Sequence, residues 1–172
     1  PAARGEPIHL TQGGYFDDGP VWFPSGDRIA FKSPRPARGG NDGEYVMTLA
    51  IDPETGQPQG PPRQVSTDRC FGYLDVSPDG ESIAFSAWSG SDKAVLVVPS
   101  VGGRARMVAR ATTRRPAWSP DGADIYYTIG MGEGEGQALV RVSLDGSETD
   151  TVVSWPGEMV TGTSGARFVL RE

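Results

Sequence analysis

Ser77-Pro78-Asp79-Gly80 is followed closely by the apolar run Ile83-Ala84-Phe85, and this pattern decides the fold because the chain repeats it. Residues 23–31 and 119–127 align with residues 77–85, and a weaker copy lies at residues 162–170. The first three copies start 54 and 42 residues apart, the longer spacing containing a Pro- and Gly-rich insert. A period in the low forties is the length of one four-stranded propeller blade.

The composition of the repeated turn predicts a β-hairpin. Proline presets φ for the second turn position, aspartate bonds back to the local backbone, and glycine accepts the positive φ that reverses the chain. The strand that leaves the turn is apolar in each copy. Trp118, in the strand that enters the third turn, is expected to pack between blades.

Two further strands follow each hairpin. The third strand of each blade is rich in Val, Leu or Tyr. The fourth strand is shorter and more polar, as an outer edge strand should be. Helix is expected to be nearly absent, because no stretch keeps a 3.6-residue apolar period. The predicted third strands are 45–51, 94–98 and 138–142, and the predicted fourth strands are 63–65, 105–108 and 149–153.

The sequence therefore predicts an all-β fold, a β-propeller of four-stranded antiparallel blades, with about four blades encoded. Residues 1–172 form one propeller segment, and residues 5–11 supply the outer strand of a preceding or shared blade. We expect a fragment of a larger propeller; the alternative is a small ring closed by pairing of the two ends. The repeats are expected at about 12–67, 68–110 and 111–157, with a partial repeat at 158–172.

Composition excludes several classes of function. The formal net charge of −6 argues against a protein that grips nucleic acid by charge. No apolar run approaches the roughly 18 to 20 residues of a membrane helix, so no membrane insertion by this segment is expected. The single cysteine, Cys70, excludes an internal disulfide and a Cys-rich zinc site. No cofactor and no metal are predicted.

Catalytic candidates are few, and the chain is predicted not to be an enzyme. His9 is the only histidine and has no nucleophile near it in sequence, so a solvent-facing side chain is expected. Cys70 is expected to be a packed thiol. Residues 130–136 lack the Gly-Lys-Ser/Thr ending of a phosphate loop and are interpreted as a flexible hairpin loop. The acidic clusters at 41–44 and at Asp17-Asp18 are interpreted as solvated turns rather than calcium sites.

The candidate binding residues lie where each repeat enters its first strand, at residues 16–19, 70–73 and 112–115. These segments occupy matching positions, so they should surround one mouth of the propeller channel. Aromatic rings, carboxylates and guanidinium groups together suit a protein or peptide partner, or a small polar ligand. The alternative is ordinary loop residues, with Asp18 and Arg114 neutralising one another. The predicted site residues are Asp17, Asp18, Phe71, Tyr73, Arg114 and Arg115.

The Ser-Pro-Asp-Gly hairpins followed by Ile-Ala-Phe resemble the TolB-type β-propeller repeat of bacterial proteins, over nearly the whole chain. Ser25 replaces the Asp in the first copy, and Thr163-Ser164 replace Pro-Asp in the last. Such repeats occur in periplasmic TolB, in the amino-terminal domains of prolyl-oligopeptidase-like hydrolases and in extracytoplasmic parts of bacterial Ser/Thr kinases.

The resemblance implies a periplasmic or extracytoplasmic location. On this basis we expect a non-catalytic ligand-binding or protein–protein interaction propeller within a larger bacterial protein. The alternative is the gating propeller of a prolyl-oligopeptidase-like serine hydrolase whose catalytic domain is absent from this chain.

Overall fold

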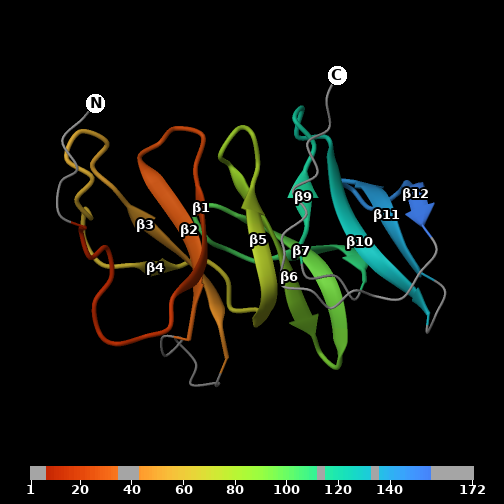
Figure 1. Ribbon diagram of the computed structural model, residues 1–172, viewed down its shortest axis with the longest axis horizontal. Helices are drawn as coiled ribbons and strands as arrows, with labels where there is room; N and C mark the ends of the chain where they lie inside the picture. Colours follow the sequence, from red (N-terminus) through yellow and green to blue (C-terminus); the bar gives the residue numbers. More distant parts are fainter. Residues whose placement is uncertain (1–6, 35–42, 112–114, 133–135, 156–172) are drawn as a thin grey trace.

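Three separate antiparallel sheets of four strands make up the computed structural model, which describes residues 7–34, 43–111, 115–132 and 136–155 (Figure 1). The described residues contain no helix, and thus none that could cross a membrane. The first sheet contains β1 (Asp18–Trp22), β2 (Arg28–Ser33), β3 (Tyr45–Ala50) and β4 (Arg63–Gln64). The second contains β5 (Cys70–Val76), β6 (Ser82–Ser89), β7 (Asp92–Pro99) and β8 (Arg106–Arg110). The third contains β9 (Ala117–Trp118), β10 (Asp124–Gly132), β11 (Gly136–Ser143) and β12 (Thr149–Trp155).

The sheets stand side by side as propeller blades. Within each, the strands follow chain order, and β5 contacts both β1 and β9. The first strand of each blade is therefore innermost and the fourth outermost. This confirms the prediction of a partial propeller of four-stranded antiparallel blades; the predicted partial blade at 158–172 lies outside the described residues.

The repeated turn has the same hydrogen bonds in the second and third blades. The Ser119 hydroxyl donates to Asp121 Oδ1 at 2.6 Å and accepts from the Asp124 amide at 2.9 Å. The Gly122 amide donates to the Ser119 carbonyl at 3.0 Å, and Gly122 has φ +73°. The serine side chain thus joins the two strands at the base of the hairpin, while glycine closes the turn.

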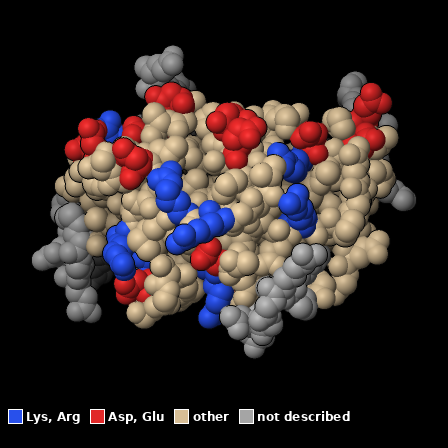
Figure 2. Space-filling view, turned by 180° about the vertical axis from the view of Figure 1, so that it is seen from behind, with Lys and Arg blue, Asp and Glu red and all other residues tan. Residues whose placement is uncertain are grey.

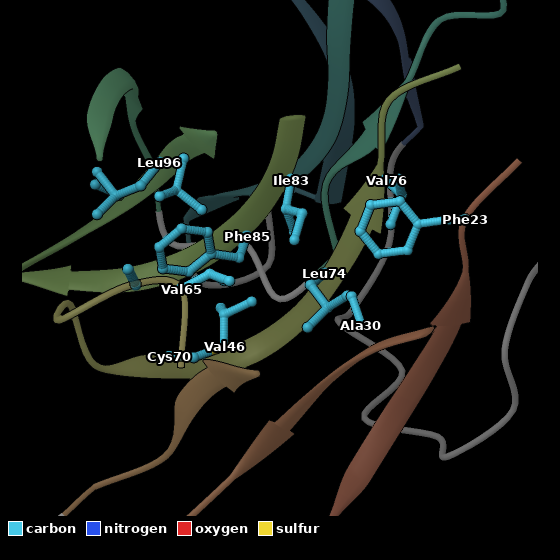
Figure 3. Close-up of a cluster of buried hydrophobic side chains, with 13 residues drawn as sticks. Phe23, Ala30, Val46, Val65, Cys70, Leu74, Val76, Ile83, Phe85 and Leu96 are labelled. Atoms are coloured by element: carbon cyan, nitrogen blue, oxygen red, sulfur yellow. The ribbon is translucent and has the colours of Figure 1, made fainter. Parts of the chain in front are cut away.

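Both faces of the second blade are buried against its neighbours. Ile83, Phe85 and Leu96 pack toward the first blade, in the cluster shown in Figure 3. Ala84 and Val97, their neighbours along β6 and β7, pack instead toward the third blade. Because successive side chains of a strand point to opposite faces, a strand between two blades must carry apolar residues on both of its faces. This explains the continuous Ile-Ala-Phe run.

Residues 7–11 do not form the predicted outer strand. This segment has no strand assignment, and Leu10 packs on the buried apolar cluster of the first blade that contains Phe31 and Leu49. Ile8 approaches Gly56, in the turn after β3. Among the described residues no strand pairs with this segment, and it contacts the first blade through its side chains instead.

Adjacent blades are joined at the outer strands by a repeated contact. The Arg63 guanidinium donates to the Val101 carbonyl at 2.8 Å, and 43 residues later Arg106 donates to the Leu144 carbonyl. The turn of the following blade packs against the same outer strand. A Cβ atom on Gly146 would lie 3.1 Å from the Val108 carbonyl oxygen. Glycine at this position therefore permits close approach of two backbones.

A second contact joins the inner strands of the second and third blades. The Trp118 amide donates to Asp75 Oδ2 at 2.8 Å, and the indole Nε1 donates to the Asp75 carbonyl at 3.3 Å. The Trp118 ring packs against the apolar cluster between these blades, as predicted. Trp22 occupies the same repeat position in the first blade but is 56% exposed.

Replacing Trp118 by alanine should lower the free energy of unfolding by about 3 kcal/mol, because a ring packed between blades is lost together with a hydrogen bond. Trp22→Ala is the matched control and should cost about 0.5 kcal/mol or less, since its ring is mostly in solvent. Urea unfolding of the two variants measures both values. Equal losses would contradict the packing described above.

Gly146→Ala should destabilise the chain more than Gly26→Ala by about 1 kcal/mol or more. Both glycines have positive φ, +77° and +74°, so both variants carry a left-handed backbone penalty of about 1 to 2 kcal/mol. Only Gly146 faces another blade at close range, whereas nothing lies within 4 Å of a Cβ on Gly26. Thermal unfolding of the pair isolates the inter-blade contact, and identical melting temperatures would argue against it.

Candidate functional site

Irregular pairing shapes the inner strands at the end of the blades opposite the repeated turns, the lower end in Figure 1. The register of β1 with β2 shifts between Asp18 and Val21, and that of β5 with β6 shifts between Cys70 and Leu74. Gly19, at φ +62°, lies inside the first irregularity. Such bulges turn side chains away from their regular direction. Here they bring Asp18 opposite Lys32, where regular pairing would place Ser33.

Lys32 is the centre of a charged cluster formed by Asp18, Lys32, Glu44, Tyr73 and Arg115, which we call the central cluster. Its ammonium lies 3.0 Å from Glu44 Oε2 and 3.3 Å from Asp18 Oδ2, and its side chain is 13% exposed. Burial disfavours the charged lysine, but the hydrogen bonds and charges of Glu44 and Asp18 outweigh that effect, so the pKa of Lys32 is raised. Lys32 therefore remains a cation that fixes two carboxylates.

Tyr73 connects the first and third blades within this cluster. The Arg115 guanidinium carbon lies 4.3 Å from the centre of the Tyr73 ring, and Lys32 Nζ lies 5.9 Å from it. A Cβ on Gly19 would lie 3.4 Å from this ring, so the glycine leaves room for the tyrosine. Tyr73 remains 39% exposed and Arg115 is exposed. The cluster thus presents an aromatic face and a guanidinium group to solvent.

Three of the predicted residues come together in the central cluster: Asp18, Tyr73 and Arg115. Asp17 lies beside Asp18 in the chain, and its amide donates to the Tyr15 carbonyl at 3.1 Å. Asp18 pairs with Lys32, and Arg114, the other partner considered for Asp18, lies outside the described residues.

Phe71 belongs to a second group of side chains, at the hairpin between β6 and β7. Its ring centre lies 5.5 Å from that of Trp88, with the two planes tilted by 54°. Lys93 Nζ lies 5.1 Å from each of the two rings. Beside them Arg110 forms an ion pair with Asp92. We call these residues, Phe71, Trp88, Asp92, Lys93 and Arg110, the hairpin cluster.

Sequence reasoning missed Lys32 and Glu44 in the central cluster and Trp88 and Lys93 in the hairpin cluster. All four lie in or beside second and third strands, whereas the prediction considered only the segments that enter the first strands. Trp88 and Lys93 are directly opposed in the register that the β6–β7 hairpin sets, so tracing that hairpin could have paired them. Lys32 and Asp18 pair only because of the bulge.

The nucleophile and metal candidates are not assembled into a reactive group among the described residues. Cys70 is buried, and that burial raises the pKa of its thiol to about 11, so it remains protonated as predicted for a packed cysteine. His9 is exposed, as expected, although not in a strand. The described part of the chain contains no group of three His, Cys, Asp or Glu side chains that could hold a metal ion.

The end of the blades that carries the repeated turns is acidic. In Figure 2, acidic side chains lie mainly along the upper edge of the molecule, which is this end. Basic side chains lie across the middle of the face shown. The turn aspartates are engaged by their own loops: a hydrogen bond from Ser119 and one from the Ala123 amide lower the pKa of Asp121. These carboxylates are turn formers, as predicted.

Comparison with known proteins gives the following. No protein-family model matches the chain. It is 36% identical over 94 residues to the uncharacterized peptidase YuxL of Bacillus subtilis, a match that covers 53% of this chain and 13% of that protein. TolB from Acinetobacter baumannii superposes with a TM-score of 0.58 at 16% identity, over 79% of this chain and 32% of TolB. A puromycin-hydrolyzing peptidase of Mycobacterium tuberculosis gives a TM-score of 0.59 at 14% identity, over 81% of this chain and 24% of the peptidase.

The chain thus spans about an eighth of the length of its peptidase relative and a third or less of the two structures. At these identities the structural likeness establishes the fold alone. That fold occurs both in TolB and in peptidases.

Asp75, a partly buried carboxylate between the second and third blades, makes the stability of the fold depend on pH. Burial raises its pKa above the ordinary 3.8, and the hydrogen bonds from the Trp118 and Val76 amides only partly oppose this effect. Because the pKa is raised in the folded state, the stability contribution of Asp75 is greatest below pH 3.8 and is lost as the pH rises through the folded-state pKa.

We therefore expect Asp75→Asn, which keeps an acceptor for Trp118, to become more stable relative to the wild type as the pH is raised from 4 to 7. Urea unfolding at several pH values in this range measures the difference. A constant difference between the two proteins would show that Asp75 does not titrate abnormally.

Proposed function

We propose that this chain, which has the TolB-type β-propeller fold, is a non-catalytic binding module that holds a peptide or an extended protein segment at the lower end of its inner strands. The central cluster is the binding surface. The observation that carries the proposal is the exposed Arg115–Tyr73 pair supported by the neutralised Lys32.

The cluster offers two kinds of contact that suit a peptide. The exposed face of Tyr73 can pack against an apolar or aromatic side chain, and the guanidinium group of Arg115 can donate to a backbone carbonyl or a carboxylate. Beside them, the largely buried ammonium of Lys32 pairs with the carboxylates of Asp18 and Glu44, so these charges neutralise one another in part. A ligand at this surface therefore meets a preorganised pair rather than flexible, isolated charges.

The position in the fold also favours binding. The central cluster combines residues of the first two blades with the segment entering the third, so it forms only when the blades are packed. A segment lying across it would contact several blades at once. We further propose that the module acts in the periplasm or elsewhere outside the cytoplasm of a bacterium, as part of a larger protein, on the basis of its fold likeness to TolB.

A second candidate function is the gating propeller of a serine peptidase whose catalytic domain is not in this chain. The partial match to the uncharacterized peptidase YuxL and the fold likeness to a puromycin-hydrolyzing peptidase favour it. In that case the same surface would contact peptide substrates on their way to the catalytic domain. Both candidates therefore assign peptide contacts to the central cluster.

Binding of a fluorescein-labelled pool of mixed-sequence decapeptides, followed by fluorescence anisotropy on the tightest member, tests the main proposal. Arg115→Ala should weaken that peptide about tenfold, the loss expected for one hydrogen bond to a charged group. Arg104→Ala is the matched control, because Arg104 is exposed near the β7–β8 turn at the other end of the blades, and should leave affinity unchanged.

Failure of every peptide to bind below about 1 mM would refute the proposal, as would equal losses in the two variants. Release of p-nitroaniline from aminoacyl or prolyl anilides by the purified chain would contradict its non-catalytic part. Cleavage by the full-length gene product alone would instead favour the gating function.

A further inference from the structure

The hairpin cluster has the features of a second ligand subsite. Trp88 is 37% exposed, although its ring packs at a tilt against Phe71 and it pairs with Lys93 across the hairpin. A shallow hollow opens beside it, lined by Trp88, Ser91, Asp92, Lys93, Arg110 and Ala111. It therefore combines an accessible aromatic face with two cations and one carboxylate.

The charges of this hollow are not balanced among the described residues. Asp92 forms an ion pair with Arg110, and Ser91 Oγ lies 3.4 Å from the same carboxylate. Lys93 contacts the faces of Phe71 and Trp88, and no carboxylate of the described residues forms an ion pair with it. Aromatic faces attract a cation without neutralising its charge. One positive charge thus remains beside an apolar surface.

We propose that the hairpin cluster binds a peptide carboxylate together with the apolar carbon atoms of the residue that carries it. The carboxylate accepts a hydrogen bond from Lys93, and the side chain beside it packs on Trp88. The two rings restrict the lysine side chain, so less conformational entropy is lost when the ligand binds. The proposal rests on the proposed function in taking a peptide as ligand, but it uses none of the residues of the central cluster.

Two sources of carboxylate fit this chemistry, the carboxyl terminus of a peptide and an acidic side chain. N-acetylphenylalanine and N-acetylglutamate α-amide are the probes for the two, and N-acetylphenylalanine amide and N-acetylglutamine amide are their uncharged counterparts. The signal is the indole N–H resonance of Trp88 in ¹H–¹⁵N spectra of the whole chain, assigned by its loss in Trp88→Leu.

We expect saturable shifts of this resonance with at least one acid, about tenfold weaker binding of the matching amide, and loss of that preference in Lys93→Met. Lys93→Met keeps the length and apolar character of the side chain, so the hairpin should remain folded, which the other indole resonances report. Arg104→Met, the matched control at the far end of the blade, should keep the preference.

Equal binding of acid and amide, or a preference that survives in Lys93→Met, would overturn the inference. These outcomes are separate from the test of the proposed function, because the small probes do not need the central cluster and the decapeptide assay uses Arg115. A carboxylate preference at Trp88 without any effect of Arg115→Ala would support this subsite and refute the central cluster as the peptide surface.

Discussion

Burial of both faces of each blade is the constraint on which the rest of this structure depends. A four-stranded sheet whose middle strands carry mostly apolar residues on both faces must be covered on two sides. The second blade satisfies this with Phe85 and Leu96 on one face and Val95 and Val97 on the other. Among the described residues the first blade has a neighbouring blade on one side, and Leu10 packs on the cluster of its other face. The exposure of Trp22, compared with the packed Trp118, shows the same difference at one repeat position.

Specific polar contacts are added to this apolar packing at the edges of the blades. Asp75 accepts hydrogen bonds from Trp118 near the centre, and Arg63 and Arg106 donate to turns of the following blade near the rim. Apolar faces alone could slide against one another, since burial is not directional. Hydrogen bonds at both edges set the position of one blade against the next, and through it the distance between Tyr73 in β5 and Arg115, which precedes β9.

The candidate binding surfaces occur where regular pairing ends. The repeated turns use their own carboxylates to close hairpins, so that end of the molecule carries engaged acidic groups. At the other end, bulges and glycines let Asp18, Lys32 and Tyr73 approach one another from different strands. Cations stacked on aromatic rings recur there in both clusters. The proposed recognition of a peptide rests on this combination, and the described residues contain no assembled nucleophile and base.

The amino-acid sequence by itself determined the hairpin turns, the order of strands in each blade and the position of Trp118 between blades, because these depend on local turn chemistry and on apolar periodicity. It also placed Asp18, Tyr73 and Arg115 at one end of the propeller, because their segments occupy equivalent repeat positions. The tertiary structure alone decided that Lys32 pairs with Asp18 and that Phe71 contacts Trp88 and Lys93 rather than Tyr73. It also decided that residues 7–11 contact the first blade through the Leu10 side chain instead of pairing as a strand. A bulge changes register without a clear signature in sequence, and a strand forms only where a partner strand is present.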